Sequence, residues 1–235
     1  MTLTPIEQKV YKAFYNGVCT LEQVKELLKN YRQAVVACKN LVAKHYFKRI
    51  KGGLYAAVPF ELAPDSNNAF SPDRYKVADL MIKDRFLSHH TALELLAGAE
   101  KIPTVYISSP SRVPDVHCAG IDYRIITTKH FFGFKDYDHN GTMIKVSDKE
   151  RTIIDCLRQI KFTNGFEELQ KILPKLAPLN FETLLHYLQK IDEMSLYTRV
   201  GYAMDIMKEG METPQHFLDA VQSKIGKRSY YLDPS

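Results

Sequence analysis

Hydrophobic positions recur at helical spacing through the first 44 residues, and the pattern then changes to two short runs with the character of strands. The spacing predicts helices over 4–15, after Thr20 and over 31–44, with Thr4, Thr20 and Asn30 as their N-caps. Two strands are expected at 46–50 and 54–58, joined by Lys51-Gly52-Gly53, which suits a tight hairpin turn. The side chains expected to point into the core are Ile6, Val10, Ala13 and Phe14 from the first helix and Ala34, Val35, Cys38, Leu41 and Val42 from the third. Three helices followed by a hairpin give the order of a winged helix-turn-helix.

The sequence from 61 to 72, ELAPDSNNAFSP, is rich in Pro, Asn, Ser and Asp and has the composition of a linker. It predicts a boundary between a winged helix-turn-helix DNA-binding domain at 1–60 and a second domain at 73–235. In the second domain, helices are expected at 73–84, 88–97, 147–160, 165–176, 181–191, 196–207 and 214–225, and strands at 104–108, 121–127, 132–137 and 142–146. The expected fold class is therefore α+β, with a larger mixed α/β C-terminal domain that is rich in helices.

Positive charge is concentrated at the N-terminus. Residues 1–60 contain ten Lys or Arg and three acids, a net charge of +7, whereas the rest of the chain contains 22 Lys or Arg and 24 acids, a net charge of −2. Such an excess is typical of segments that neutralise nucleic-acid phosphates. No apolar run reaches the roughly 20 residues that cross a bilayer, and the first residues lack the apolar core of a signal peptide. A cytoplasmic protein with no membrane partner is therefore expected.

The third predicted helix has an apolar face and a polar face, as a helix that reads the major groove requires. Arg can pair with guanine, Gln or Asn can pair with adenine, and Val36 can contact a thymine methyl group. The residues expected to face the bases are Tyr31, Arg32, Gln33, Val36, Lys39 and Asn40. The residues expected to hold phosphates or enter the minor groove, at the helix end and in the wing, are Lys44, Lys48, Arg49 and Lys51.

Five segments carry a family resemblance through their shared order and spacing. They are LVAKHYFKRIKGGLYAAVP, FLSHHTALELLAG, IPTVYISSP, IKVSDKERTIIDCL and RVGYAMDIM. With these segments, most of the chain resembles the AbiEi-type antitoxin and transcriptional regulator family, which is associated with type IV toxin-antitoxin and phage-defence operons. The chain departs from the family pattern in its long helical tail after Gly210.

The resemblance implies a repressor that binds inverted repeats of double-stranded DNA in its own promoter, as a homodimer or as two copies. It also implies a functional partner, a nucleotidyltransferase-like toxin, which the protein counters without forming a stable complex. The C-terminal domain is implicated in that antitoxin role. The resemblance assigns no role to individual residues of this second domain.

Two other functional classes fit parts of the sequence. A metal-dependent nuclease would use the acids Asp136, Asp138, Glu150 and Asp155 with Lys145 and Lys149. Asp138 also suits a hairpin turn, however, and Glu150 suits a helix N-terminus. A winged helix can instead dock RNA or protein. Because the sequence has no Gly-rich phosphate loop, no GxSxG and no HExxH, we expect neither an enzyme nor a cofactor.

The cysteines and a histidine pair are expected to be structural. Cys19, Cys38, Cys118 and Cys156 lie far apart in the sequence, so they are interpreted as small buried residues and not as zinc ligands. Adjacent helical residues diverge by about 100°, so His89 and His90 could not both bind one metal ion. Ser88 is expected to cap their helix, with the histidines packed or hydrogen-bonded locally. No metal site is predicted.

Overall fold

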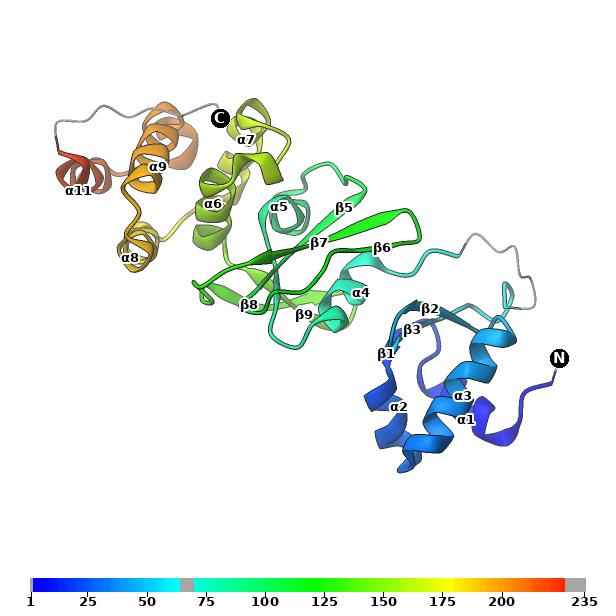
Figure 1. The fold of residues 1–235 in the computed structure, drawn as a ribbon. Coiled ribbons are helices and arrows are strands. Elements are labelled where there is room, and N and C mark those ends of the chain that lie inside the picture. Colours follow the sequence, from blue (N-terminus) through cyan, green and yellow to red (C-terminus); the bar gives the residue numbers. More distant parts are fainter. Residues whose placement is uncertain (1, 64–69, 227–235) are drawn as a thin grey trace. The chain divides into compact units, whose positions relative to one another are not determined.

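The protein is a mixed α+β chain that divides into two compact units. The computed structural model describes residues 2–63 and 70–226 (Figure 1). One unit, here the N-terminal unit, comprises residues 1–83 and 114–123. The other, the C-terminal unit, comprises residues 84–113 and 124–235. Among the described residues, no helix combines the length and the apolar character needed to span a bilayer.

The N-terminal unit places helices against a small antiparallel sheet. Its elements are α1 (Pro5–Ala13), β1 (Val18–Thr20), α2 (Leu21–Leu28), α3 (Tyr31–Ala43), β2 (Phe47–Lys51), β3 (Leu54–Ala57) and α4 (Arg74–Met81). The sheet order is β1-β3-β2. The predicted hairpin is present as β2 and β3, with Gly53 at a φ of 76° in its turn. β1 was not predicted, because a three-residue strand has too few positions for a pattern and exists here through its pairing with β3.

The three predicted N-caps are confirmed by their hydrogen bonds. The Thr4 hydroxyl accepts from the Glu7 backbone N–H at 3.3 Å, and the Thr20 hydroxyl accepts from that of Gln23 at 3.2 Å. The Asn30 side-chain oxygen accepts from the backbone N–H of Gln33 at 3.1 Å. These bonds satisfy donors that the first turn of a helix leaves without an intrahelical partner, which fixes where α1, α2 and α3 begin.

The predicted inward faces of α1 and α3 need correction. Val35 is 38% exposed, and the buried face of α3 consists of Ala34, Ala37, Cys38 and Leu41. In α1, Ile6 is 41% exposed, while the acid beside it, Glu7, is buried together with Val10 and Tyr11. Hydrophobic spacing alone did not show which of two adjacent positions is buried. The rotation of each helix about its axis is set by its tertiary contacts.

The boundary between the units lies after α4, later than the linker predicted at 61–72. α4 contacts β1 and β3, so it packs as part of the N-terminal unit. Two lysines of β2 also bind the chain beyond the hairpin, since Lys48 Nζ donates to the Phe70 carbonyl at 2.8 Å and Lys51 Nζ donates to the Met81 carbonyl at 2.6 Å. Residues 64–69 of the predicted linker lie outside the described residues.

The C-terminal unit contains most of a six-stranded sheet and the later helices. The strands of this sheet are β4 (Phe86–Leu87), β5 (Thr104–Ser109), β6 (Val116–Cys118), β7 (Ile121–Thr127), β8 (Phe134–His139) and β9 (Thr142–Ser147), in the order β6-β7-β5-β4-β9-β8. β6 and the first residues of β7 belong to the N-terminal unit. The β8–β9 hairpin was predicted, and it turns through Asn140 and Gly141, both at positive φ. β4 and β6 were not predicted because they have two and three residues.

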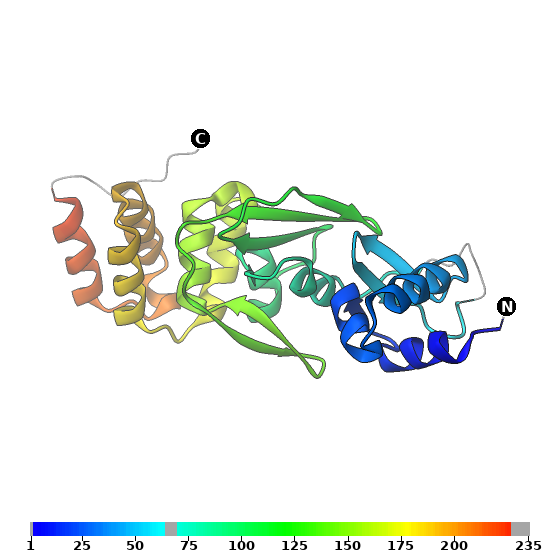
Figure 2. The same cartoon turned by 60° about the horizontal axis from the view of Figure 1, so that its bottom comes forward.

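Helices cover the sheet and continue beyond it (Figure 1 and Figure 2). They are α5 (His89–Ala97), α6 (Lys149–Arg158), the 3₁₀ turn η1 (Ile160–Phe162), α7 (Phe166–Ile172), the 3₁₀ turn η2 (Leu173–Leu176), α8 (Phe181–Ile191), α9 (Met194–Ile206), α10 (Lys208–Met211) and α11 (Gln215–Ile225). α6 packs against α5, α8 and α9, and α11 packs against α8 and α9. Their facing sides form one hydrophobic core that runs from Leu93 to Ile225.

Arg151 lies at the centre of this unit and is only 1% exposed. Its Nε donates to Asp155 Oδ1 at 2.9 Å, and its Nη1 donates to the carbonyls of His130 and Phe132 at 2.8 and 3.2 Å. The guanidinium carbon also lies 4.9 Å from the ring centre of Phe132 and 5.5 Å from that of Phe86. A buried charge requires such partners, so these contacts join α6 to the loop before β8.

Candidate nucleic-acid interface

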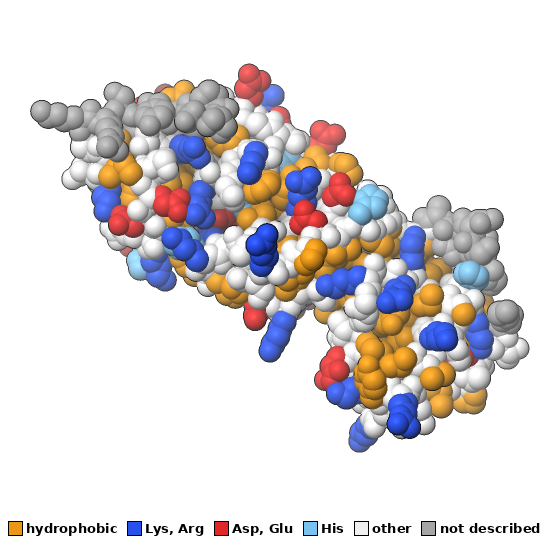
Figure 3. Space-filling model, in the orientation of Figure 1, with side chains coloured by type: hydrophobic (Ala, Val, Ile, Leu, Met, Phe, Trp, Pro, Cys, Tyr) orange, Lys and Arg blue, Asp and Glu red, His pale blue; other side chains and the backbone are white. Residues whose placement is uncertain are grey.

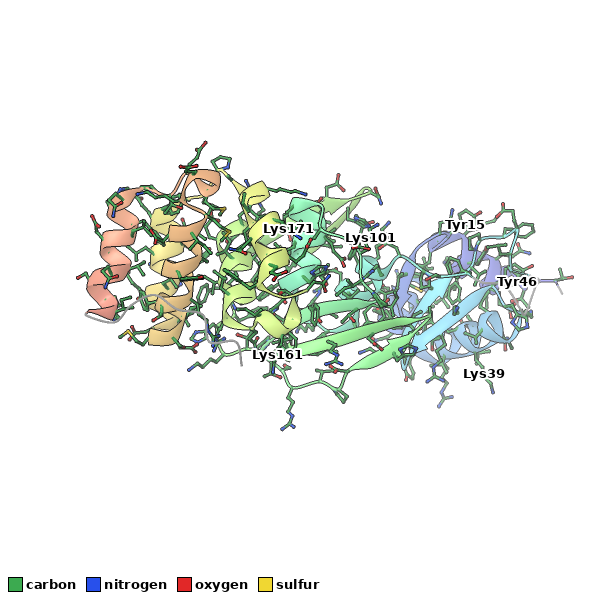
Figure 4. The ribbon with its side chains drawn as sticks, turned by 90° about the horizontal axis from the view of Figure 1, so that it is seen from above. Tyr15, Lys39, Tyr46, Lys101, Lys161 and Lys171 are labelled. Carbon is green, nitrogen blue, oxygen red and sulfur yellow. The ribbon has the colours of Figure 1, made fainter. Side chains whose placement is uncertain are left out.

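Six of the ten residues predicted to contact DNA are exposed. They are Tyr31, Arg32, Gln33, Val36 and Lys39 on α3, and Arg49 on β2. Figure 4 shows the side chain of Lys39 extending away from α3. The N-cap of α3 places Arg32 and Gln33 in its first turn, so that their polar groups project from the start of the helix. The structure therefore brings one guanidinium, one amide and one ammonium group onto the outer side of a single helix.

The other two predicted residues at the far end of the helix bind a buried acid. Asn40 Nδ2 donates to Glu7 Oε1 at 3.0 Å, and Lys44 Nζ donates to Glu7 Oε2 at 2.6 Å. Lys44 Nζ also donates to the Thr2 carbonyl at 3.1 Å. Burial acts to raise the pKa of Glu7, but these bonds and the Thr4 backbone N–H outweigh it and hold that pKa below its usual value. Asn40 and Lys44 therefore hold α1 against α3. This corrects the prediction that their side chains face outward toward DNA.

Lys48 and Lys51, the two β2 lysines that were predicted to contact DNA, also have partners within the N-terminal unit. Lys48 and Lys51 are half-buried, and each donates one hydrogen bond to a backbone carbonyl. Burial lowers the pKa of Lys51. Arg49 is the exposed cation of this strand, so it is better placed than its two neighbours to reach a phosphate.

The sequence analysis assigned no role to Glu7, although the sequence contains a motif that indicates one. Thr4 and Glu7 have the spacing of a capping box, and the Glu7 carboxylate accepts from the Thr4 backbone N–H at 2.8 Å. The capping box places the carboxylate beside the first turn of α1. Only the packing of α3 then shows that Asn40 and Lys44 converge on it.

Hydrophobic side chains lie beside the exposed polar groups of α3. Val36 is 56% exposed and Tyr31 is 57% exposed. A groove of about 400 Å³ between α1 and α3 is lined by Ile6, Val36 and Ala37 together with Arg32 and Gln33. In Figure 3, hydrophobic side chains gather over α2 and α3 with Lys and Arg spread around them. The face is thus mixed, and not purely cationic.

The acids considered for a nuclease are dispersed, and each has a local partner. Asp136 pairs with Lys145 at 3.2 Å, and Asp138 accepts from the Gly141 backbone N–H at 2.8 Å in the hairpin turn. The Glu150 carboxylate accepts from the Asn180 backbone N–H at 2.7 Å, while Lys149 Nζ donates to the Pro178 carbonyl at 3.3 Å. Within the described residues, no three His, Cys, Asp or Glu side chains come together in a way that could hold a metal ion.

The histidine pair is buried and hydrogen-bonded locally, as predicted. His89 Nδ1 lies 2.9 Å from Ser88 Oγ and its Nε2 lies 3.2 Å from Gln159 Oε1, while His90 Nε2 lies 2.8 Å from the Glu100 carbonyl. The Ser88 side chain makes no capping bond, which corrects the predicted cap: its hydroxyl accepts from that of Ser108 at 2.8 Å instead. Burial lowers the pKa of His89.

This lowered pKa predicts that acid destabilises the C-terminal unit through His89. Below about pH 6.5 the unfolded chain takes up a proton that the folded chain does not, so stability present at pH 7 is lost as the pH falls. We expect the unfolding free energy to fall as the pH drops below about 6.5, by at most about 1.4 kcal/mol per pH unit through this residue.

Urea unfolding of wild type and His89→Gln across this pH range measures the effect. The His89→Gln slope should be shallower than the wild-type slope, and His216→Gln, at an exposed histidine of the C-terminal unit, is the matched control. Equal slopes in all three proteins would contradict the assignment.

Three of the four cysteines are fully buried, as predicted, and Cys118 is half-buried. All four are free thiols. Burial raises the pKa of Cys38 to about 11 and that of Cys156 well above its usual value. A raised pKa suppresses the thiolate, so Cys38 and Cys156 behave as small apolar residues in the cores of the two units.

The fold is similar to that of a protein of known crystal structure, the RV2827C protein from Mycobacterium tuberculosis. The TM-score is 0.63, and the match covers 99% of this chain and 85% of that chain at 17% sequence identity. At this identity the similarity establishes the fold alone. No family model matches the chain, and no curated protein matches it.

Proposed function

We propose that the protein is a sequence-specific DNA-binding transcriptional repressor whose N-terminal unit is a winged helix-turn-helix. The observation that carries this proposal is the joint exposure of Arg32, Gln33 and Lys39 on the outer side of α3. These are the side-chain types that hydrogen-bond base edges and phosphates. They lie in a segment, residues 1–60, whose net charge is +7.

The order of elements supports this proposal. α2 and α3 follow one another with a short connection, and the β2–β3 hairpin comes directly afterwards, with β1 pairing on the other side of β3. In a winged helix-turn-helix, α3 would enter the major groove and the hairpin would lie beside it. Arg49 on β2 then supplies the wing contact to the phosphates, in place of Lys48 and Lys51.

The AbiEi-type resemblance supplies the biological part of the proposal. We infer an antitoxin that represses its own operon from inverted repeats, as a homodimer or as two copies on DNA. Its functional partner is a nucleotidyltransferase-like toxin, which it counters without a stable complex. The protein itself is proposed to be non-catalytic and to need no cofactor.

A binding experiment tests the proposed DNA interface. The full chain is used to select duplexes from a random-sequence library, and the selected duplex is compared with a scrambled one by fluorescence anisotropy. Arg32→Ala and Gln33→Ala should each cost about 1 to 3 kcal/mol at one base pair and relax the preference there. Lys39→Gln and Arg49→Gln should weaken binding to both duplexes and lower the slope of log K against log salt by about one each.

Lys171→Gln is the matched control, because Lys171 is an exposed lysine of α7 in the C-terminal unit. It should leave both affinities unchanged. If no sequence is enriched, or if Arg32→Ala and Gln33→Ala bind the selected duplex as the wild type does, then α3 does not read DNA.

The exposed hydrophobic residues of α3 favour a second candidate, a protein-docking module. Tyr31, Val35 and Val36 are apolar and exposed beside the groove formed with α1. Adjacent exposed apolar side chains are typical of protein interaction sites. The same selection separates the two candidates, because a docking module would enrich no DNA sequence and its residual DNA affinity would not depend on Gln33.

A further inference from the structure

The C-terminal unit contains a polar cavity of about 300 Å³ that the proposed DNA-binding function does not use. It is formed by residues from the start of α5, from β5, from the end of β7, from the end of α6 and from α9, all within this unit. Most of its lining side chains are polar, and Ile126 and Leu196 are the hydrophobic exceptions. Its volume is near the lower end of the range of about 300 to 1,000 Å³ found for ligand pockets.

A buried carboxylate oxygen at this cavity lacks a hydrogen-bond donor. Asp155 is 3% exposed, and its Oδ1 accepts from Arg151 Nε. Its Oδ2 is buried and has no hydrogen-bond partner among the residues that the structure describes. Leaving such an acceptor without a partner away from water is costly, so nearly all buried polar groups in proteins are hydrogen-bonded. Asp155 also lines the cavity, so this acceptor belongs to the cavity wall.

The opposite charge is also available in the cavity. Arg158 is occupied by Glu193, with its Nε 2.8 Å from Oε2 and its Nη2 2.6 Å from Oε1. Arg199 donates through Nη1 to the Arg158 carbonyl at 2.8 Å and forms no ion pair with any described residue. A guanidinium presents several donors in one plane, which suits recognition of a carboxylate or a phosphate.

His89 forms a fixed part of the cavity wall. Both of its ring nitrogens already have partners in Ser88 and Gln159, and its backbone has a φ of 52°, in the left-handed region. A non-glycine residue keeps such a conformation only where its surroundings hold it in place. The wall is therefore preorganised, and two charged side chains in it, Asp155 and Arg199, have polar atoms available to a ligand.

We propose that the C-terminal unit binds a small molecule that carries both an anionic group and an N–H or O–H donor. The anionic group pairs with Arg199, and the donor satisfies Asp155 Oδ2. α-Amino acids and nucleoside monophosphates share this chemistry. The proposal is independent of DNA binding, because every residue it uses lies in the C-terminal unit.

Ligand-observed NMR with the full chain tests this site. The two sets of probes are the twenty common amino acids and the monophosphates AMP, CMP, GMP and UMP, so the responding set identifies the source of the anion. At least one probe should bind saturably with a Kd below about 1 mM. Arg199→Met should raise that Kd about tenfold or more, because it removes the charged partner and keeps much of the side-chain volume.

Arg112→Met is the matched control, since Arg112 is an exposed arginine of the same unit outside the cavity. The half-buried Arg199 side chain donates one hydrogen bond, to the Arg158 carbonyl, so its replacement should leave the fold intact, which far-UV circular dichroism checks. Binding by neither probe set below about 1 mM, or equal binding by Arg199→Met and Arg112→Met, would overturn the proposal.

Discussion

Replacing Arg151 with Met should lower the unfolding free energy of the C-terminal unit by about 3 to 5 kcal/mol. The substitution leaves Asp155 as a buried carboxylate without its cation, and it removes the hydrogen bonds to the carbonyls of His130 and Phe132. Met keeps much of the packing against the rings of Phe86 and Phe132, so most of the loss should be electrostatic. Urea unfolding followed by circular dichroism measures it.

The double variant Arg151→Met/Asp155→Asn separates the charge from the packing. Removing the second charge should recover part of the lost stability, because the large cost comes from an uncompensated buried ion and not from the absence of the pair. The single variant Asp155→Asn completes the comparison. If the stability losses of Arg151→Met and Asp155→Asn simply add up to the loss in the double variant, then Arg151 and Asp155 act independently, contrary to the geometry described above.

Gly133→Ala should lower the unfolding free energy by about 2 to 4 kcal/mol, through backbone strain together with steric overlap. Gly133 has a φ of 71°, a conformation that L residues with a side chain rarely adopt. A Cβ at this position would lie 2.9 Å from Arg151 Cβ and 3.0 Å from Tyr187 Cε2. Arg151 cannot easily give way, because its side chain is held on several sides. Thermal and urea unfolding measure the combined cost.

Gly141→Ala is the control that isolates backbone strain. Gly141 has a φ of 74°, and nothing lies within 4 Å of a Cβ built there. Its replacement should cost only about 1 to 2 kcal/mol, as expected for a left-handed backbone without a clash. If Gly133→Ala costs no more than Gly141→Ala, the close approach to Arg151 and Tyr187 has no energetic consequence.

Most of the long elements could be predicted because their signals are local. The helix at Phe181–Ile191 has the predicted bounds, and the caps at Thr4, Thr20 and Asn30 depend on residues only three positions away. The three shortest strands, β1, β4 and β6, are too short for their sequences to show a period. Their hydrogen-bonding partners lie elsewhere in the chain, so their existence depends on tertiary pairing.

The candidate interface was predictable only in part. Arg32, Gln33 and Lys39 were expected to be exposed and are exposed, since helical periodicity places them away from Cys38 and Leu41. Lys44 and Lys51 were predicted to contact DNA because they are positively charged. The charge of a lysine does not show which acid or carbonyl lies beside it in the folded chain. Their partners, Glu7 and the Met81 carbonyl, lie 37 and 30 residues away in the sequence.

The sequence by itself determined where the main helices begin and that a hairpin follows the third helix. It also determined that positive charge is concentrated in the first 60 residues. These properties depend on neighbouring residues or on composition. Tertiary structure alone decided which cations remain exposed and where the boundary between the units falls. It also decided that Asp155, Arg199 and His89, which are far apart in the chain, line one cavity. The physical reason is that burial and ion pairing depend on distances in space, which chain folding sets and sequence spacing does not.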